Sequence, residues 1–245
     1  MYRICILIFT LFGCSSTLPD ESLSLAEHLK IGMDYLDEKE FVKAQDEFKF
    51  ILSLGAGTDY GDDAQFFLAE SYFLNKQYML SIAEYESLTR KMSFSPFFEK
   101  SRFRICEAYR IESPQYYNDQ SYTEKALERY QEFLDDFPNS EYSQTATESM
   151  IVLRKKLAKK LYETGVLYMK MDEFEPARMS FNRVLDDYYD TDVVQEAHIG
   201  VIKSFLSEQK TSLAREYWNN KGRDDVVKVQ LIDEVNQLFL KAEKK

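Results

Sequence analysis

Cysteine and histidine are the side chains of this 245-residue chain best suited to nucleophilic, redox or metal chemistry. Cys5, Cys14 and Cys106 are too far apart for a Cys-x-x-Cys pair, and neither His28 nor His198 belongs to a His-Glu-x-x-His motif. The chain also has no Gly-rich phosphate loop and no nucleophile elbow. Carboxylates are plentiful, but no spacing pairs two of them in a cleft. We therefore expect no catalytic residue, no metal site and no cofactor, in a protein that is not an enzyme.

Cys14 stands in a setting that predicts a different chemistry. A single basic residue, Arg3, precedes a nine-residue, mostly apolar run that ends at Phe12. Such a run is too short to span a bilayer as a helix, but it suits the central region of a secretory signal. The sequence Leu11-Phe12-Gly13-Cys14 resembles a bacterial lipobox, in which a signal peptidase cuts before the cysteine and the cysteine is acylated. A eukaryotic signal with a chance cysteine is the alternative.

Acylation would tether the chain to a membrane through the lipid and not through a spanning helix. The tether would be firm, because each buried methylene of the acyl chains contributes about 0.8 kcal/mol. Residues 15–21 are polar and contain a proline, so we assign residues 1–13 to a signal peptide and 14–22 to a lipidated, flexible tether. Ser15 occupies the position at which lipoproteins retained in the inner membrane commonly carry Asp. The resemblance therefore implies an outer-membrane lipoprotein that faces the periplasm. Cys106 would be the remaining thiol, expected to pack rather than to react.

The charge balance excludes some partners. The chain carries 42 acidic and 31 basic residues, a formal net charge of −11 at pH 7. That charge repels phosphate backbones and anionic lipid surfaces, so we expect no nucleic acid and no general affinity for membranes, while a basic partner is compatible. Runs such as Arg154-Lys155-Lys156 and Asp186-Asp187 are expected on solvated helix faces.

The elements that carry these residues follow an internal repeat. A first aromatic residue is followed nine positions later by a small residue, and the small residue is followed four positions later by a second aromatic. In the third unit an insert displaces the small residue. The first aromatics are Tyr35, Tyr72, Tyr109, Tyr168 and Phe205, and the second are Phe48, Tyr85, Tyr130, Phe181 and Trp218. Because positions three or four apart share a helical face, a ring on each helix is expected to pack over a small residue of its neighbour, such as Gly32 or Ala44. Each unit is predicted to be a helical hairpin.

This register resembles the tetratricopeptide repeat, although its common interval of 37 residues exceeds the roughly 34 usual for that class. The resemblance implies an all-α superhelix of five helical hairpins, closed by a C-terminal capping helix predicted at residues 224–244. Another antiparallel helical array is the alternative. His28 and His198 lie at the same repeat position, seven residues before Tyr35 and Phe205, and are expected to pack rather than to bind metal.

Irregular stretches are expected between and within the repeats. They are a glycine-rich loop at residues 55–61, an aromatic stretch at 93–98 and an insert at 113–120, ahead of a long helix at about 141–170. The phenylalanines of residues 93–98 are expected to cover the core between repeats, with an exposed aromatic lip as the alternative. Inserts in repeat proteins often serve recognition.

The order of these features resembles one family, the BamD lipoproteins of the outer-membrane β-barrel assembly machinery. The features are the lipobox, five long repeats, an insert in the third, a Phe-Pro-Asn-Ser-Glu-Tyr turn at residues 137–142 and a Leu-Arg-x-x-Leu-Ala helix from Leu153 into the fourth. The resemblance implies a non-enzymatic adaptor. Residues 23–138 would bind unfolded outer membrane proteins, and residues 139–245 would dock on periplasmic domains of the barrel-forming subunit and on accessory lipoproteins. A pilotin-like lipoprotein that escorts a secretin and an enzyme built on repeats are the alternatives.

In the repeat class that the chain resembles, first-helix positions six before, two before and one after the first aromatic face the concave surface. In the first three units these positions give a predicted peptide-binding groove of Leu29, Met33, Leu36, Phe66, Glu70, Phe73, Phe103, Glu107 and Arg110. We expect the rings and aliphatic groups to hold an extended apolar peptide, with Arg110 available for a carboxylate. The alternative is that some of these side chains only fill space between helices.

Overall fold

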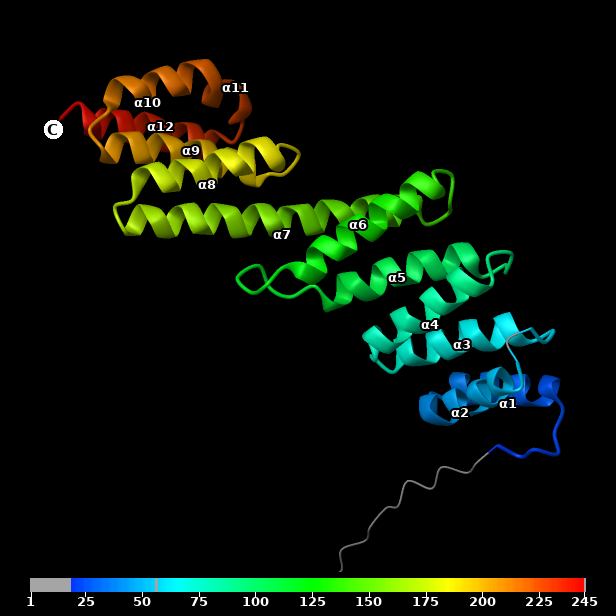
Figure 1. The fold of residues 1–245 in the computed structure, drawn as a ribbon. Coiled ribbons are helices and arrows are strands. Elements are labelled where there is room, and N and C mark those ends of the chain that lie inside the picture. Colours follow the sequence, from blue (N-terminus) through cyan, green and yellow to red (C-terminus); the bar gives the residue numbers. More distant parts are fainter. Residues whose placement is uncertain (1–18, 56, 245) are drawn as a thin grey trace, which may run out of the picture. The chain divides into compact units, whose positions relative to one another are not determined.

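The computed structural model describes residues 19–55 and 57–244, so the signal peptide and Cys14 lie outside the described residues. Throughout the described residues the chain is all-helical and has no strand, as predicted (Figure 1). In this part of the chain none of the helices combines the length and apolar character needed to cross a membrane. The chain forms two compact units, Met1–Ser101 (unit 1) and Arg102–Lys245 (unit 2), and each is described by itself. The division predicted after Pro138 concerns function and stays a prediction.

Unit 1 contains two complete hairpins and the first residues of a third. Its helices are α1 (Leu25–Asp37), α2 (Phe41–Ser53), α3 (Gly61–Leu74) and α4 (Tyr78–Lys91), followed by the start of α5 (Phe98–Glu112). Ser24 and Glu27 cap α1 reciprocally, since each side chain accepts a hydrogen bond from the other residue's backbone N–H. Successive helices pack side by side in the order α1, α2, α3, α4. The predicted helical hairpins are therefore confirmed here.

The turn inside a hairpin has the same backbone form in both units. Four residues after the first aromatic, the chain takes a left-handed conformation at Lys39, Lys76, Asp172 and Gln209, with φ between 59° and 62°. The next backbone N–H then donates to the carbonyl of the first aromatic, at 2.8–3.0 Å. This closure satisfies a helix-end carbonyl and reverses the chain within three residues.

Packing of a ring over a small residue is confirmed in two hairpins. The ring of Phe48 on α2 lies so close to Gly32 on α1 that a Cβ at Gly32 would sit 2.6 Å from Cε1 of Phe48. A Cβ at Gly165 would likewise lie 2.5 Å from Cε1 of Phe181. Both rings are buried. Close approach of the two helices therefore depends on the missing side chain of the glycine.

Unit 2 holds the remaining hairpins and the C-terminal cap. After α5 come α6 (Ser121–Asp136), α7 (Ser143–Lys170), α8 (Phe174–Asp187), α9 (Val193–Ser207), α10 (Thr211–Tyr217), a π-helical turn η1 (Trp218–Gly222), α11 (Arg223–Asp225) and α12 (Val229–Ala242). The long helix α7 packs on α6, and on α8 and α9 of the next hairpins. One chain segment thus closes the third repeat and opens the fourth.

The continuous helix predicted over residues 224–244 is wrong at its start. Val226 is extended and only 1% exposed, so the chain dips into the core between α11 and α12. The Gln195 side chain on α9 accepts hydrogen bonds from the backbone N–H groups of Val227 and Lys228. These bonds satisfy the donors that the break exposes, and α12 begins only at Val229.

Candidate functional site

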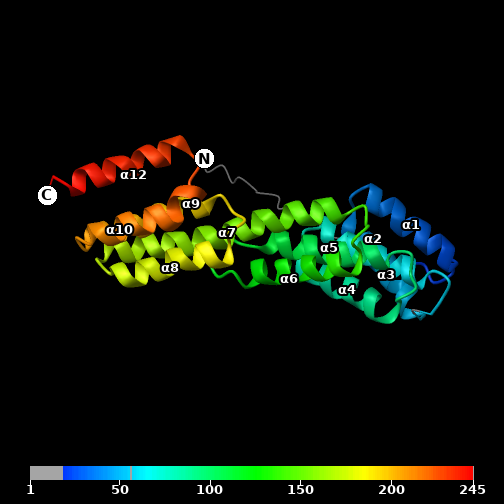
Figure 2. The same cartoon turned by 90° about the horizontal axis from the view of Figure 1, so that it is seen from above.

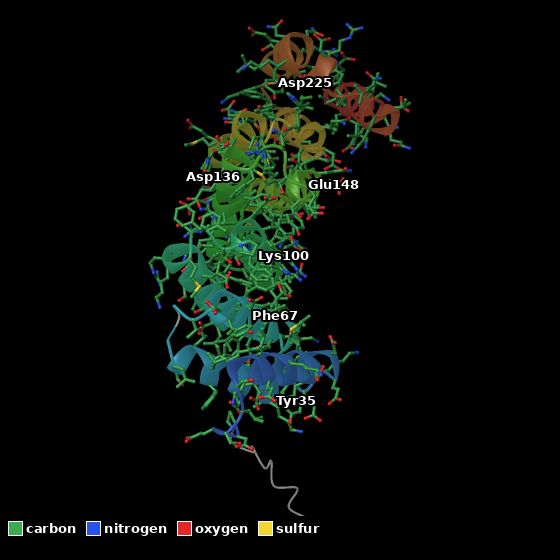
Figure 3. All side chains as sticks on the ribbon, turned by 90° about the vertical axis from the view of Figure 1, so that its right-hand side faces the viewer. Tyr35, Phe67, Lys100, Asp136, Glu148 and Asp225 are labelled. Carbon is green, nitrogen blue, oxygen red and sulfur yellow. The ribbon has the colours of Figure 1, made fainter. Side chains whose placement is uncertain are left out.

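The predicted groove residues of α3 are occupied within unit 1. Phe66 is 1% exposed, and its ring stacks on Phe97 with centroids 4.3 Å apart and planes 10° from parallel. The Lys100 ammonium lies 5.0 Å from the same ring, and the labels of Lys100 and Phe67 in Figure 3 locate this packed region. Glu70 is 7% exposed and accepts a hydrogen bond from the Tyr85 hydroxyl at 2.5 Å. Phe66 and Glu70 therefore belong to the interior of this unit.

The other groove residues of unit 1 are more open. Met33 on α1 is 40% exposed, whereas Leu29 and Leu36 are half-buried and pack against the core around Ala44 and Phe48. Phe73 on α3 is half-buried, and its ring meets Tyr78 edge-on at 5.3 Å. Among the predicted groove positions of unit 1, Met33 is thus exposed, and Leu29, Leu36 and Phe73 are half-buried.

In unit 2 the predicted site residues of α5 form a polar cluster beside a buried ring. Phe103 is 8% exposed and stacks on Tyr142, with centroids 4.5 Å apart. Glu107 accepts hydrogen bonds from Arg110, at 2.9 Å from Nε and 2.6 Å from Nη2, and a third from the Tyr130 hydroxyl. The Arg110 guanidinium therefore already holds a carboxylate of its own helix.

Burial and hydrogen bonding set the protonation of this cluster. Burial alone would raise the pKa of Glu107, but the hydrogen bonds from Arg110 and Tyr130 outweigh it and hold that pKa below its usual value. Burial, with Glu107 as its neighbour, raises the pKa of the Tyr130 hydroxyl. The hydrogen bond to Glu107 raises the pKa of Arg110. At neutral pH the cluster is therefore a carboxylate, a guanidinium and a neutral phenol, in which Arg110 and Glu107 pair their opposite charges.

One feature of this cluster recurs, and the groove prediction overlooked it. The second aromatic donates a hydroxyl hydrogen bond to the groove carboxylate in both the second repeat (Tyr85 to Glu70) and the third (Tyr130 to Glu107). The sequence signal was available, because the second aromatic is Tyr only in these two repeats, whose groove position is Glu. This pairing, with the burial of Phe66 and Phe103, fits the space-filling alternative at these positions.

Both histidines tie one helix to another element. His28 is fully buried, with Nδ1 2.6 Å from the Glu47 carboxylate, and His198 has Nδ1 2.7 Å from the Tyr217 hydroxyl. The second nitrogen of His198 lies 3.0 Å from Asp225, which is labelled in Figure 3. Burial lowers the pKa of His198 and outweighs the opposing effect of Asp225. Among the described residues no group of three or more His, Cys, Asp or Glu side chains could hold a metal ion.

The basic run of α7 lies on a partly solvated face, as expected, and also makes contacts that the sequence did not predict. Each of its three cations reaches another part of unit 2, so the run fastens α7 to the loop before α9 and to the insert. The partners of Arg154, Lys155 and Lys156 are both carboxylate oxygens of Asp190 (2.8 and 2.7 Å), Asp192 (2.9 Å) and the hydroxyl of Ser113 (2.6 Å). Sequence reasoning missed these links because their partners lie 36 to 43 positions away.

The two irregular aromatic stretches present one ring each to solvent. In the loop before α5, Phe97 stacks on Phe66, as expected for a core cover, whereas Phe94 is fully exposed, as the alternative had it. In the insert Tyr117 is 69% exposed. The buried Gln120 holds the insert in shape, since its amide donates to two carbonyls of the same loop. A recognition role for the insert stays a prediction.

Stacked helical hairpins with rings packed over small residues define a tetratricopeptide-repeat protein. The chain belongs to the YfiO family, described as outer membrane lipoprotein, whose family profile matches residues 23–217. Outer membrane protein assembly factor BamD of Rickettsia prowazekii (strain Madrid E) is 25% identical over 219 residues, which cover 86% of this chain and 84% of that protein.

Solved structures with a similar arrangement of helices are tetratricopeptide-repeat proteins. One, from Parabacteroides merdae ATCC 43184, is 14% identical, with 88% of this chain and 72% of that chain covered and a TM-score of 0.39. Another, from Thermus thermophilus, is 14% identical, with 89% and 100% covered and a TM-score of 0.38.

Proposed function

We propose that this protein is a non-enzymatic adaptor that assists the assembly of outer membrane proteins. It is anchored by acylated Cys14, faces the periplasm, binds unfolded β-barrel proteins and docks on the barrel-forming insertase subunit. The observation that carries the proposal is the family match over residues 23–217, which includes repeats of both proposed halves. The assembly-factor name of the Rickettsia relative supports the same role. The proposed adaptor role uses no cofactor.

Substrate binding is assigned to the repeats of residues 23–138. In unit 1 the accessible or half-buried apolar side chains at groove positions are Met33, Leu29, Leu36 and Phe73, which suit an extended segment with aromatic and aliphatic side chains. Phe66 and Phe103 are buried and would hold the helices beneath the peptide rather than touch it. Glu107 and Arg110 would offer hydrogen bonds from the edge of their existing pair.

A charge substitution on the open face tests this surface. Met33→Glu should weaken the binding of a peptide with the sequence of an aromatic-ended β-barrel strand about tenfold, because it places a carboxylate where an apolar side chain binds. Met79→Glu is the matched control, since Met79 is 44% exposed and Met33 40%. Fluorescence anisotropy measures both affinities. Equal affinity for the two variants would rule out the α1 surface.

Docking is assigned to residues 139–245, with the periplasmic domains of the barrel-forming subunit and accessory lipoproteins as partners. Several large apolar side chains of unit 2 are open to solvent there, as an interface requires. Ile151 and Val152 on α7 are 51% and 62% exposed, and Tyr189 before α9 is 74% exposed. They neighbour Arg154 and Asp190 in the sequence, whose ion pair joins α7 to the loop before α9.

Co-purification of the full-length protein from membranes in mild detergent tests the proposal as a whole. We expect a β-barrel subunit with periplasmic domains to accompany the native chain. Mass spectra of the native protein should show an acylated Cys14. A secretin as the sole barrel partner would overturn the assembly role, and a native chain whose Cys14 carries no acyl group would overturn the anchor.

A further inference from the structure

A shallow apolar groove lies in unit 2 where α7, α9 and α12 end. Its volume is about 370 Å³. It is lined by Met169, Lys203, Leu206, Ser207, Leu238, Lys241 and Ala242. α9 packs against both α7 and α12, and the three helices run to the same side of unit 2 in Figure 1, with α12 alongside α9 again in Figure 2. The groove is thus built from three separate helix ends.

The groove occupies repeat positions that the first three units use for the predicted substrate groove. Met169 stands one residue after the first aromatic Tyr168, and Leu206 one residue after Phe205. Lys203 stands two before Phe205, where the second and third repeats have a buried or half-buried glutamate held by a tyrosine. In the last repeats these positions therefore line an open groove with aliphatic side chains at Met169 and Leu206, and Lys203 reaches Glu234 of α12 in place of a glutamate held by a tyrosine.

The floor of the groove is a packed core, so its shape does not depend on a ligand. Ile202 and Val235 are fully buried, and Leu206 and Leu238 pack against the cluster that contains them. The third wall, α12, begins at Val229, beyond residue 217 where the family match ends. The groove is therefore completed by a segment outside the region that defines the family.

The rim of the groove reverses the charge of the chain as a whole. The chain has a formal net charge of −11, yet Lys203 and Lys241 line the groove and Lys170 follows Met169 at the end of α7. Lys203 pairs with Glu234 at 2.7 Å, and both are half-exposed. Lys241 is exposed and makes no ion pair with the described residues. Lysines in a last turn stabilise helix ends, and their ammonium groups remain available to carboxylates.

We propose that this groove binds an apolar polypeptide segment that carries carboxylate side chains. The aliphatic floor would take alternate apolar side chains, and the rim lysines would pair with the flanking carboxylates and set the register. The inference deepens the proposed docking role of residues 139–245 and rests on that role for the partner's place in the cell. Binding itself rests on the groove alone.

Short synthetic peptides test the chemistry without a known partner. Leucine and phenylalanine alternate with glutamate in one peptide, with glutamine in the second and with lysine in the third. Fluorescence anisotropy with the full-length chain measures affinity, and ¹³C-methyl methionine spectra, with Met169 assigned through Met169→Leu, report the site. We expect the glutamate peptide to shift the Met169 methyl signal and to bind about tenfold more tightly than the glutamine peptide.

Matched substitutions separate recognition from helix stability. Lys241→Gln should weaken the glutamate peptide about fivefold. Lys244→Gln removes a lysine at the same chain end but outside the groove and should leave affinity unchanged. Leu238→Ser should lower affinity and Leu240→Ser should not, since Leu240 is 57% exposed and does not line the groove. Thermal melts serve as the folding control: the melting temperature of each of the four variants must match that of the parent within a few degrees. Leu238→Met replaces Leu238→Ser if Leu238→Ser lowers the melting temperature further.

Several results would overturn the proposal. They are equal affinity for the glutamate and glutamine peptides, no shift of Met169 by the glutamate peptide, and equal losses from Lys241→Gln and Lys244→Gln. A Met169 shift caused by phosphatidylglycerol vesicles but not by peptides would make the occupant a lipid instead. Concentration-dependent dimerisation that shifts Met169 would make it a second copy. The assembly role is judged separately by co-purification, so either result stands without the other.

Discussion

Substitution of Gly165 by alanine tests the close helix packing on which the repeats depend. A Cβ at Gly165 would lie 2.5 Å from Cε1 of Phe181, about 1 Å inside the normal contact distance between carbons. The ring has little room to retreat, because a Cβ at Gly200 on α9 would also lie only 2.7–2.8 Å from Cε2, Cζ and Cε1 of the same ring. Phe181 is 1% exposed, so it cannot swing into solvent.

The magnitude follows from two opposed effects. Overpacking of a filled core costs about 1–3 kcal/mol, while replacing a mid-helix glycine by alanine returns about 0.5–1 kcal/mol. Because the ring is closely approached by both Gly165 and Gly200, the first effect should dominate. We expect Gly165→Ala to lower the free energy of unfolding by about 1–2 kcal/mol, which corresponds to a loss of about 3–6 °C in melting temperature for a domain of this size.

Urea unfolding followed by circular dichroism measures the loss, and two further variants interpret it. Gly57→Ala is the matched control: no heavy atom lies within 4 Å of its Cβ position, so stability should not fall. Adding Phe181→Leu to Gly165→Ala should relieve the overlap and give a favourable coupling of about 1 kcal/mol in a double-mutant cycle. A Gly165→Ala protein as stable as the parent, or a coupling near zero, would refute the packing argument.

Three other predictions concern unit 2. Tyr130→Phe removes a donor to the Glu107 carboxylate and should lower the free energy of unfolding by about 1–2 kcal/mol in urea at pH 7; an unchanged midpoint would contradict that hydrogen bond. Burial lowers the pKa of His198, so the unfolded state binds more protons below the ordinary value of 6.5. Stability should therefore fall as pH drops from 7 toward 5, and thermal melts of His198→Gln should lose that part of the slope; an identical slope in the variant would exclude His198 as its source. Burial raises the pKa of the Cys106 thiol to about 12, so iodoacetamide at pH 8 should label it only after unfolding; labelling of the native protein in mass spectra would argue against a packing role.

The hairpins were predictable because their determinants are local and repeat. A small residue and a ring at fixed spacing predict which faces meet, and the contacts of Gly32 with Phe48 and of Gly165 with Phe181 confirm it. The left-handed turn residues were harder to find. Lys39 stands where a glycine would have been the signal, and its backbone is held by the hydrogen bond that closes the turn. The clue in the sequence was the constant spacing, since each left-handed residue lies four positions after the first aromatic of its hairpin.

Partner choice over long distances was not predictable. Arg154 and Asp190 are 36 residues apart, and their bidentate pair exists only because α7 is long enough to reach the loop before α9. Charge patterning along α7 indicated a solvated face. It could not indicate these ion pairs, because the pattern contains no information about a loop two elements later in the chain. The break at Val226 escaped for the same reason, because Gln195 on α9 satisfies its neighbouring donors.

The predicted groove shows that a class rule gives a position but not a side chain's neighbours. A buried carboxylate needs donors, so Glu70 and Glu107 are accompanied by tyrosines where the first and fourth repeats have Phe48 and Phe181. The hydrogen bonds from the tyrosine hydroxyls already satisfy the glutamates at the groove positions of the second and third repeats. In the proposed function, apolar recognition then falls to repeats whose second-helix ring has no hydroxyl. In unit 1 these include the repeat of Met33, and in unit 2 the repeats whose inward positions are completed by α12. A polypeptide bound through apolar contacts should therefore engage these repeats before it engages the glutamates.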